Sequence, residues 1–125
     1  MVDWSFVDLL SAEFEGCKIV EGDSRSKAPK REWCLNGTAV AWERPLSKRD
    51  MAALGASAPK GPVMAVRVPD LQARDQWISK APQACFTSLH FATYPAVLVD
   101  MERADAATVR ALFDLGVQAV TLKGL

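Results

Sequence analysis

The sequence predicts an α+β domain with two layers, in which helices pack on one face of a mostly antiparallel sheet of about five strands. Three observations support this fold class. Strand-like segments joined by a tight turn come early, helical and strand-like segments alternate afterwards, and residues 95–101 form a run that is apolar on both faces. With 125 residues, half of them hydrophobic, the chain has the length of a single domain, 1–125, with a packed core.

The N-terminal part begins with a predicted helix. Apolar residues at helical spacing over 4–14 follow Asp3, whose side chain is suited to cap the first turn. The short apolar segment 17–22 predicts a strand. Residues 23–31 are rich in serine and basic residues and contain a proline, so they predict an exposed loop.

The clearest local signal is the pair Asn36-Gly37, which lies between two strand-like runs. This pair is preferred in two-residue hairpin turns, where both residues need a positive φ. Alternation places Trp33 with Leu35 on one face of the first arm and Val40 with Trp42 on one face of the second. We expect one core that contains Trp33, Leu35, Trp42, Val66, Val97, Val99, Leu112 and Phe113.

Helices and strands alternate in the second half. A short helix is predicted over 47–55, because Ser47 and Asp50 match a capping box and Gly55 can end the helix. A β-branched strand, a helix opened by an aspartate, the doubly apolar strand and a final helix opened by an aspartate follow, over 61–69, 70–81, 95–101 and 105–120.

Charge is distributed unevenly although the formal net charge is zero. Residues 1–23 carry six acids and one base, and residues 24–49 carry seven bases and two acids. The two stretches form patches of opposite sign or neutralise each other across the surface. The zero net charge argues against a strongly basic nucleic-acid binder, yet the basic stretch is suited to phosphate contact. Its seven bases are Arg25, Lys27, Lys30, Arg31, Arg44, Lys48 and Arg49.

No catalytic or metal-binding motif is present in the sequence. The three cysteines, Cys17, Cys34 and Cys85, lack zinc-site spacing and fit reduced, buried thiols. His90 is the only histidine, so a multi-histidine metal site is excluded, and nothing in the spacing brings it to Cys85. We therefore expect no enzyme activity, no metal and no cofactor. The acidic N-terminus and the lack of a long apolar run predict a cytoplasmic chain without a membrane span.

The stretch "CFTSLHFATYPAVLVDM" and the segments around it resemble the MmcQ/YjbR family. The matching motifs are Val68-Pro69-Asp70, Phe86-Thr87, His90-Phe91 and the run 94–99. The chain departs from the family pattern at Phe91, where tyrosine is common, and at Thr93, where glycine is common. The resemblance implies a two-layer fold of the frataxin and secretion-chaperone type. It also implies a DNA-binding role that rests on fold analogy, and it supplies no catalytic residue.

Two functions remain open at this point. The first is weak nucleic-acid binding through the seven bases, with Trp33 and Trp42 either stacking on nucleobases or buried in the core. The second is a protein-interaction or small-ligand module with a groove near His90 and Tyr94, in which Thr87 is the third ligand-binding residue.

Overall fold

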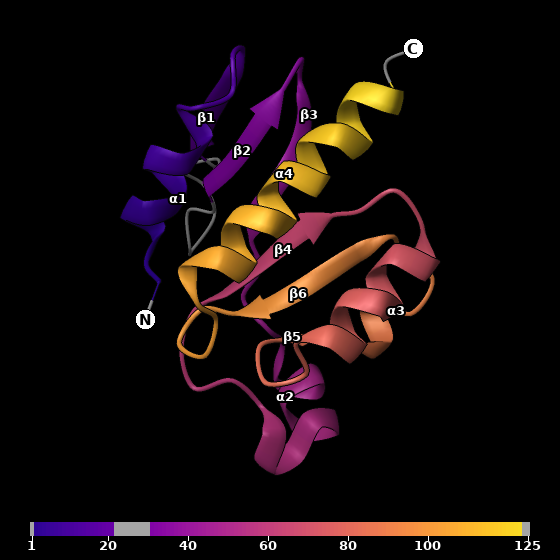
Figure 1. Cartoon of the computed structure of the whole chain (residues 1–125). Helices are drawn as coiled ribbons and strands as arrows, with labels where there is room; N and C mark the ends of the chain where they lie inside the picture. The colour runs from indigo at the N-terminus through magenta and orange to yellow at the C-terminus, as the bar shows by residue number, and fades with distance from the viewer. Residues whose placement is uncertain (1, 22–30, 124–125) are drawn as a thin grey trace.

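The computed structural model describes residues 2–21 and 31–123 (Figure 1). Its helices are α1 (Trp4–Ser11), α2 (Lys48–Leu54), α3 (Leu71–Lys80) and α4 (Ala106–Lys123). Its strands are β1 (Cys17–Glu21), β2 (Arg31–Leu35), β3 (Thr38–Glu43), β4 (Val63–Arg67), β5 (Cys85–Phe86) and β6 (Ala96–Asp100). Two short 3₁₀ turns complete the fold, η1 (Gly55–Ser57) and η2 (Leu89–Phe91).

The strands form one antiparallel sheet in the order β1-β2-β3-β4-β6-β5, which confirms the predicted α+β class. The sheet has six strands rather than five. The additional strand, β5, has two residues, which is too short to produce a periodic pattern in the sequence. Strand β6 lies between β4 and β5 and all five of its residues are buried, as its apolar composition predicted.

Helices α1, α3 and α4 pack on one face of the sheet, which we call the helix face. Figure 1 shows α4 running across the strands on this face. The main core lies between these helices and the sheet and contains seven of the eight predicted core residues, Trp33, Leu35, Val66, Val97, Val99, Leu112 and Phe113. Gly116 allows α4 to approach closely, because a Cβ there would lie 2.9 Å from Val40 Cγ1 and 3.1 Å from the Arg67 carbonyl oxygen.

The opposite face of the sheet, which we call the second face, carries a smaller apolar cluster. Its buried members are Val63, Ala65, Phe91, Ala96 and Leu98. Trp42 packs against this second cluster and not in the main core, so its predicted position is wrong. The cause is a β-bulge at Val40, since Trp33 pairs with Ala41 and Cys34 with Ala39. The extra residue reverses the alternation, so Val40 and Trp42 point to opposite faces.

The predicted helix caps are present. The Asp3 side chain accepts a hydrogen bond from the Phe6 amide, and Asp70 accepts one from the Ala73 amide. Ser47 accepts from the Asp50 amide at 3.1 Å, and Asp105 accepts from the Thr108 amide at 2.7 Å. Helix α2 ends at Gly55, where φ is 59°. The first helix stops at Ser11, three residues before its predicted end, and a turn places Phe14 against the Phe113 ring.

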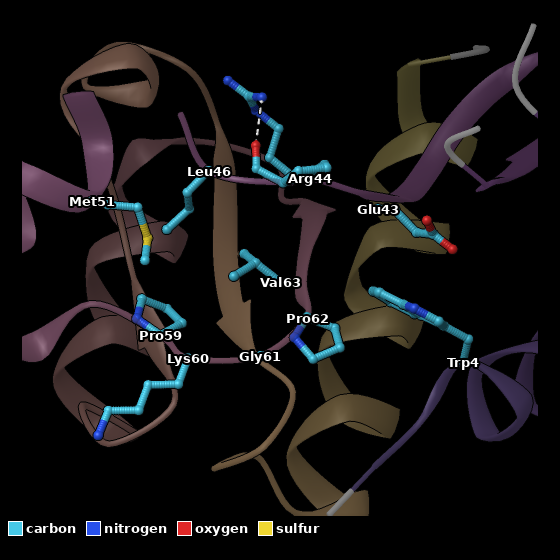
Figure 2. A pocket seen from close by; sticks show the side chains of 11 residues that line it. Trp4, Glu43, Arg44, Leu46, Met51, Pro59, Lys60, Gly61, Pro62 and Val63 are labelled. Carbon is cyan, nitrogen blue, oxygen red and sulfur yellow. Dashed lines mark hydrogen bonds between the residues drawn. The ribbon is translucent and has the colours of Figure 1, made fainter. Parts of the chain in front are cut away.

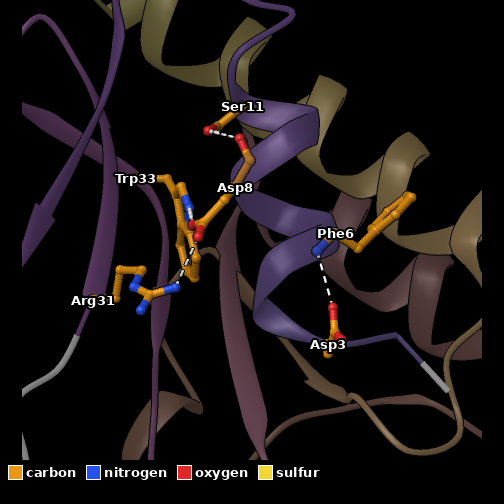
Figure 3. A network of polar contacts seen from close by, with 6 residues as sticks. All are labelled: Asp3, Phe6, Asp8, Ser11, Arg31 and Trp33. Carbon is orange, nitrogen blue, oxygen red and sulfur yellow. Dashed lines mark hydrogen bonds and ion pairs between the residues drawn. The ribbon is translucent and has the colours of Figure 1, made fainter.

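A carboxylate joins α1 to the hairpin (Figure 3). Asp8 accepts a hydrogen bond from the Trp33 indole N–H at 2.9 Å and forms an ion pair with Arg31 at 3.0 Å. The Trp33 side chain is fully buried, so its N–H needs this acceptor. The Asp8 carboxylate therefore provides the acceptor for a buried N–H of the core. It also pairs an acid of the stretch 1–23 with a base of the stretch 24–49.

The hairpin turn gives a first prediction. Asn36 and Gly37 have φ values of 52° and 79°, as expected for a turn with two left-handed residues. A Cβ at Gly37 would contact nothing within 4 Å, so a substitution there tests backbone conformation alone. Gly37→Val should lower the free energy of unfolding by roughly 1–2 kcal/mol in a denaturant melt. The control Asn36→Gly should have a small effect, and an equally small effect of Gly37→Val would contradict the prediction.

The Asp8 interaction gives a second prediction. Asp8→Ala should lower the free energy of unfolding by roughly 1–3 kcal/mol, because the buried Trp33 N–H loses its acceptor. Asp8→Asn keeps an acceptor oxygen and loses only a partly exposed ion pair, so it should lower that free energy by less than about 1 kcal/mol. Equal losses for both variants in a denaturant melt would show that the ion pair, not the indole hydrogen bond, stabilises the contact.

Candidate functional site

The structure does not gather the predicted basic residues on one surface. Arg25, Lys27 and Lys30 lie outside the described residues. Arg31 is on the helix face, paired with Asp8. Arg44 is on the second face, where its guanidinium lies over the Phe91 ring, while Lys48 and Arg49 are exposed on α2.

An aromatic–arginine cluster on the second face is the most distinctive polar feature there. It consists of Trp42, Arg44, Arg67, Phe91 and Tyr94. The Arg67 guanidinium carbon lies 5.8 Å from the ring centroids of both Trp42 and Tyr94, and these two rings meet edge to face at 6.4 Å. Arg44 lies 5.3 Å from the centroid of Phe91, whose ring meets Tyr94 at 5.7 Å. The arginine-to-ring distances of 5.3 and 5.8 Å are within the range of cation–π attraction.

Strand register and one loop position this cluster. Trp42 pairs with Ala65, and Arg67 pairs with Ala96, so both long side chains stand above small neighbours. The Arg67 Nε–H donates to the Ala39 carbonyl oxygen at 2.9 Å, which holds the guanidinium beside both rings. Phe91 and Tyr94 come from the loop between β5 and β6, which folds over the second face.

A buried arginine holds this loop in place. Arg74 of α3 donates to the carbonyl oxygens of Phe91 at 3.1 Å and Ala92 at 2.9 Å, and it forms an ion pair with Asp75 at 2.9 Å. In the described structure the cross-links come from a residue on another element, which neither spacing nor composition reveals.

Two arginines of the cluster have no acidic partner in the described part of the chain. Among the described residues, neither Arg44 nor Arg67 forms an ion pair with a carboxylate. Both are half-buried, and Tyr94 beside them is 38% exposed. An exposed ring next to two unneutralised guanidinium groups is suited to a ligand that has both a flat ring and a negative charge.

The three predicted ligand-binding residues do not share one site. Tyr94 belongs to the cluster. His90 is exposed on η2, with its ring 5.7 Å from that of Phe91. Thr87, whose hydroxyl is buried, lines a different cavity together with Asp50 and Ser88.

A cavity of about 380 Å³ lies at the ends of β3 and β4, close to α1 and α2 (Figure 2). Its apolar lining residues include Leu46, Met51, Pro59, Pro62 and Val63. Trp4 and Glu43 lie together at one side in Figure 2, whereas the charged ends of Arg44 and Lys60 point away from the hollow. The cavity therefore offers packing surface and a single carboxylate, with no arrangement of catalytic groups.

The thiols are held in their protonated form. Burial raises the pKa of Cys85 to about 11, and it also raises the pKa of Cys17. For Cys34, burial and the nearby Glu32 carboxylate raise the pKa. Cys85 lies in the main core while His90 is exposed, so the two do not form a dyad. Within residues 2–21 and 31–123, no three His, Cys, Asp or Glu side chains gather as a metal site.

Comparisons with known proteins add relatives but no function. No family model matches the chain, and no solved structure matches it. It is similar to uncharacterised proteins of Mycobacterium bovis (Mb2600) and Mycobacterium tuberculosis (Rv2570), each 42% identical over 71 residues. The matched region covers 54% of this chain and 55% of each relative, so the chain spans about half the length of the curated relatives it matches. In the described part of the chain, no helix has the length and apolar character of a membrane span.

The thiols give a third prediction. Iodoacetamide at about pH 8 should modify Cys17 first and Cys85 last, because alkylation needs an accessible thiolate and Cys85 is 1% exposed. Peptide mass spectrometry over a time course measures the order. Cys85 should react at the rate of Cys17 only after denaturation, and rapid native modification of Cys85 would contradict its buried position.

Proposed function

We propose that this chain is a binding domain that takes single-stranded nucleic acid on the second face of its sheet, through the aromatic–arginine cluster. The observation that carries the proposal is the position of Arg67. Its guanidinium carbon lies 5.8 Å from the ring centroids of both Trp42 and Tyr94, and it has no carboxylate partner among the described residues. Aromatic side chains that stack on bases, next to cations that contact phosphates, are the general means of binding single strands.

The surroundings of the cluster support an extended ligand. From Arg67 the second face continues over β3 and β2 to β1, through the row Ala39, Cys34 and Lys18. Ala39 is small and Lys18 is exposed. A nucleic-acid strand that crosses the sheet along this row therefore passes a small side chain and then reaches a further cation, Lys18. Glu32 is exposed on the same face opposite Trp42 and repels phosphate there, which limits the affinity.

A single strand fits this surface better than a duplex. Stacking on Tyr94 requires an unpaired base, and a flat sheet has no element that enters a groove. The net charge of zero gives little long-range attraction. We therefore expect weak binding without sequence preference, on the order of 10⁻⁴–10⁻⁶ M at physiological salt. In this proposal Lys48 and Arg49, which are exposed on α2, add further phosphate contacts.

We also propose that the chain belongs to the MmcQ/YjbR family. The segments that carry the resemblance build the region around the cluster: Val68-Pro69-Asp70 joins β4 to α3, His90-Phe91 lies in η2, and Tyr94 precedes β6. The α+β fold agrees with the fold that the resemblance implies. Three free thiols suit the reducing cytoplasm, which is the compartment we propose.

A second candidate is protein binding at the same loop. Leu89 of η2 is 75% exposed and lies next to His90, so the loop presents an apolar side chain beside the exposed Tyr94 ring. Such a partner needs no phosphate, and its binding would depend little on salt.

The nucleic-acid proposal gives a fourth prediction. Fluorescence anisotropy with labelled oligothymidylate should show binding at about 50 mM salt, with a matching duplex bound more weakly. Tyr94→Ala should weaken binding by about 1–3 kcal/mol, the value of one stacked base. Arg67→Gln should reduce the slope of log affinity against log salt by about 0.7, the value for one phosphate contact on a single strand.

Controls separate this site from general charge effects. Lys80→Gln removes the same charge from α3, where Lys80 lies over the Trp77 ring, and should leave binding nearly unchanged. Each variant is compared with the parent by thermal melting before binding is measured. No binding at about 50 mM salt would exclude the proposal in favour of the protein-binding candidate. Equal losses for Arg67→Gln and Lys80→Gln would show that the cluster is not the site.

A further inference from the structure

A second cavity, of about 330 Å³, lies between α2 and the loop that carries η2. It is separate from the aromatic–arginine cluster and from the cavity of Figure 2, with which it shares no lining residue. Its wall is mostly apolar, and Asp50, Thr87 and Ser88 are its polar residues. Its lining residues are Asp50, Ala53, Leu54, Thr87, Ser88, Leu89 and Ala92.

Among the described residues, two hydroxyl groups of this wall have no hydrogen-bond partner. The hydroxyl oxygens of Thr87 and Ser88 are buried and form no hydrogen bond. Asp50 is only 6% exposed, and among the described residues no group donates a hydrogen bond to its carboxylate. A buried polar group without a partner costs roughly 1–3 kcal/mol, and two adjacent ones beside a buried carboxylate are unusual for a structural role alone.

We propose that this cavity binds the protonated amino group of a small ligand with a short apolar body. An ammonium group has three donors and no acceptor, which matches one carboxylate and two hydroxyl oxygens. The apolar side chains of Ala53, Leu54, Leu89 and Ala92 then cover the carbon chain of the ligand.

Other ligand classes fit this wall less well. Asp50 repels an anion, and a neutral alcohol leaves the carboxylate without a counter-charge. A hard metal ion such as Ca²⁺ takes six to eight oxygen ligands, whereas this wall supplies one carboxylate and two hydroxyls. The two hydroxyl oxygens are buried in the structure, so an amine reaches them after their side chains rotate to another staggered position.

Titration with a simple amine tests this site directly. The ¹⁵N-labelled chain is titrated with n-butylammonium chloride at constant ionic strength, and amide shifts are followed by NMR. We expect saturable shifts confined to the amides around Ala53, Thr87, Ser88 and Ala92, with a dissociation constant in the millimolar range typical of about −3 to −4 kcal/mol of binding free energy. Butan-1-ol should bind at least about tenfold more weakly, and butyrate should not bind.

Variants test the assigned contacts. Asp50→Asn keeps the side-chain size, removes the charge, and should weaken butylammonium binding at least about tenfold. Thr87→Val keeps the shape, removes one acceptor, and should weaken it about threefold to tenfold. Asp114→Asn, on the exposed side of α4, is the matched control and should change nothing. If Asp50→Asn fails to fold, Thr87→Val and Ser88→Ala carry the test.

Three results would overturn the proposal. The first is the lack of a saturable shift up to about 50 mM amine, which corresponds to a binding free energy weaker than about −2 kcal/mol. The second is equal affinity for butan-1-ol, which would mean an apolar hollow only. The third is unchanged amine binding by folded Asp50→Asn or Thr87→Val.

Discussion

The requirement to cover strand β6 on both faces shapes the rest of this fold. All five of its residues are buried, and it lies between β4 and β5 inside the sheet. On one face Val97 and Val99 pack beneath the helices, and on the other Ala96 and Leu98 pack beneath the η2 loop. A loop is a less stable cover than a helix because its backbone groups are not paired internally. Arg74 provides the missing pairing, and the position of the aromatic–arginine cluster follows from that anchor.

Local sequence signals predicted much of the scaffold. Asp3, Ser47, Asp70 and Asp105 cap helices, because a short polar side chain before an apolar periodic segment has few other roles. The Asn36-Gly37 turn was likewise predictable, since its backbone geometry depends on the two residues themselves. Strand β5 was missed because its existence depends on pairing with β6 and not on its own two residues.

The candidate site was much less predictable. The bulge at Val40 places Trp42 on the second face instead of in the main core, and no residue type in that strand predicts a bulge. In the sequence, Arg67 and Arg74 are ordinary charged residues of a strand and a helix. Their roles depend on residues of other elements, the Trp42 ring for Arg67 and the Phe91 carbonyl oxygen for Arg74. Of the basic segment, Arg31 and Arg44 are on opposite faces, because side-chain direction alternates along each strand and a charge count contains no such information. Tyr94 was named from the sequence, and it is the exposed ring of the cluster.

The position of β1 at the end of the strand order has a consequence for how the protein behaves in concentrated solution. One long side of this strand has no neighbour among the described strands, and its Ile19 and Val20 side chains are 45% and 46% exposed. An unpaired apolar edge is a template for adding a further strand, whether from a partner or from another copy of the chain. Lys18 and Glu21 bracket the apolar pair and place charge at both ends of it. Charged residues that flank an apolar edge disfavour strand addition, so the charges of Lys18 and Glu21 oppose self-association along β1.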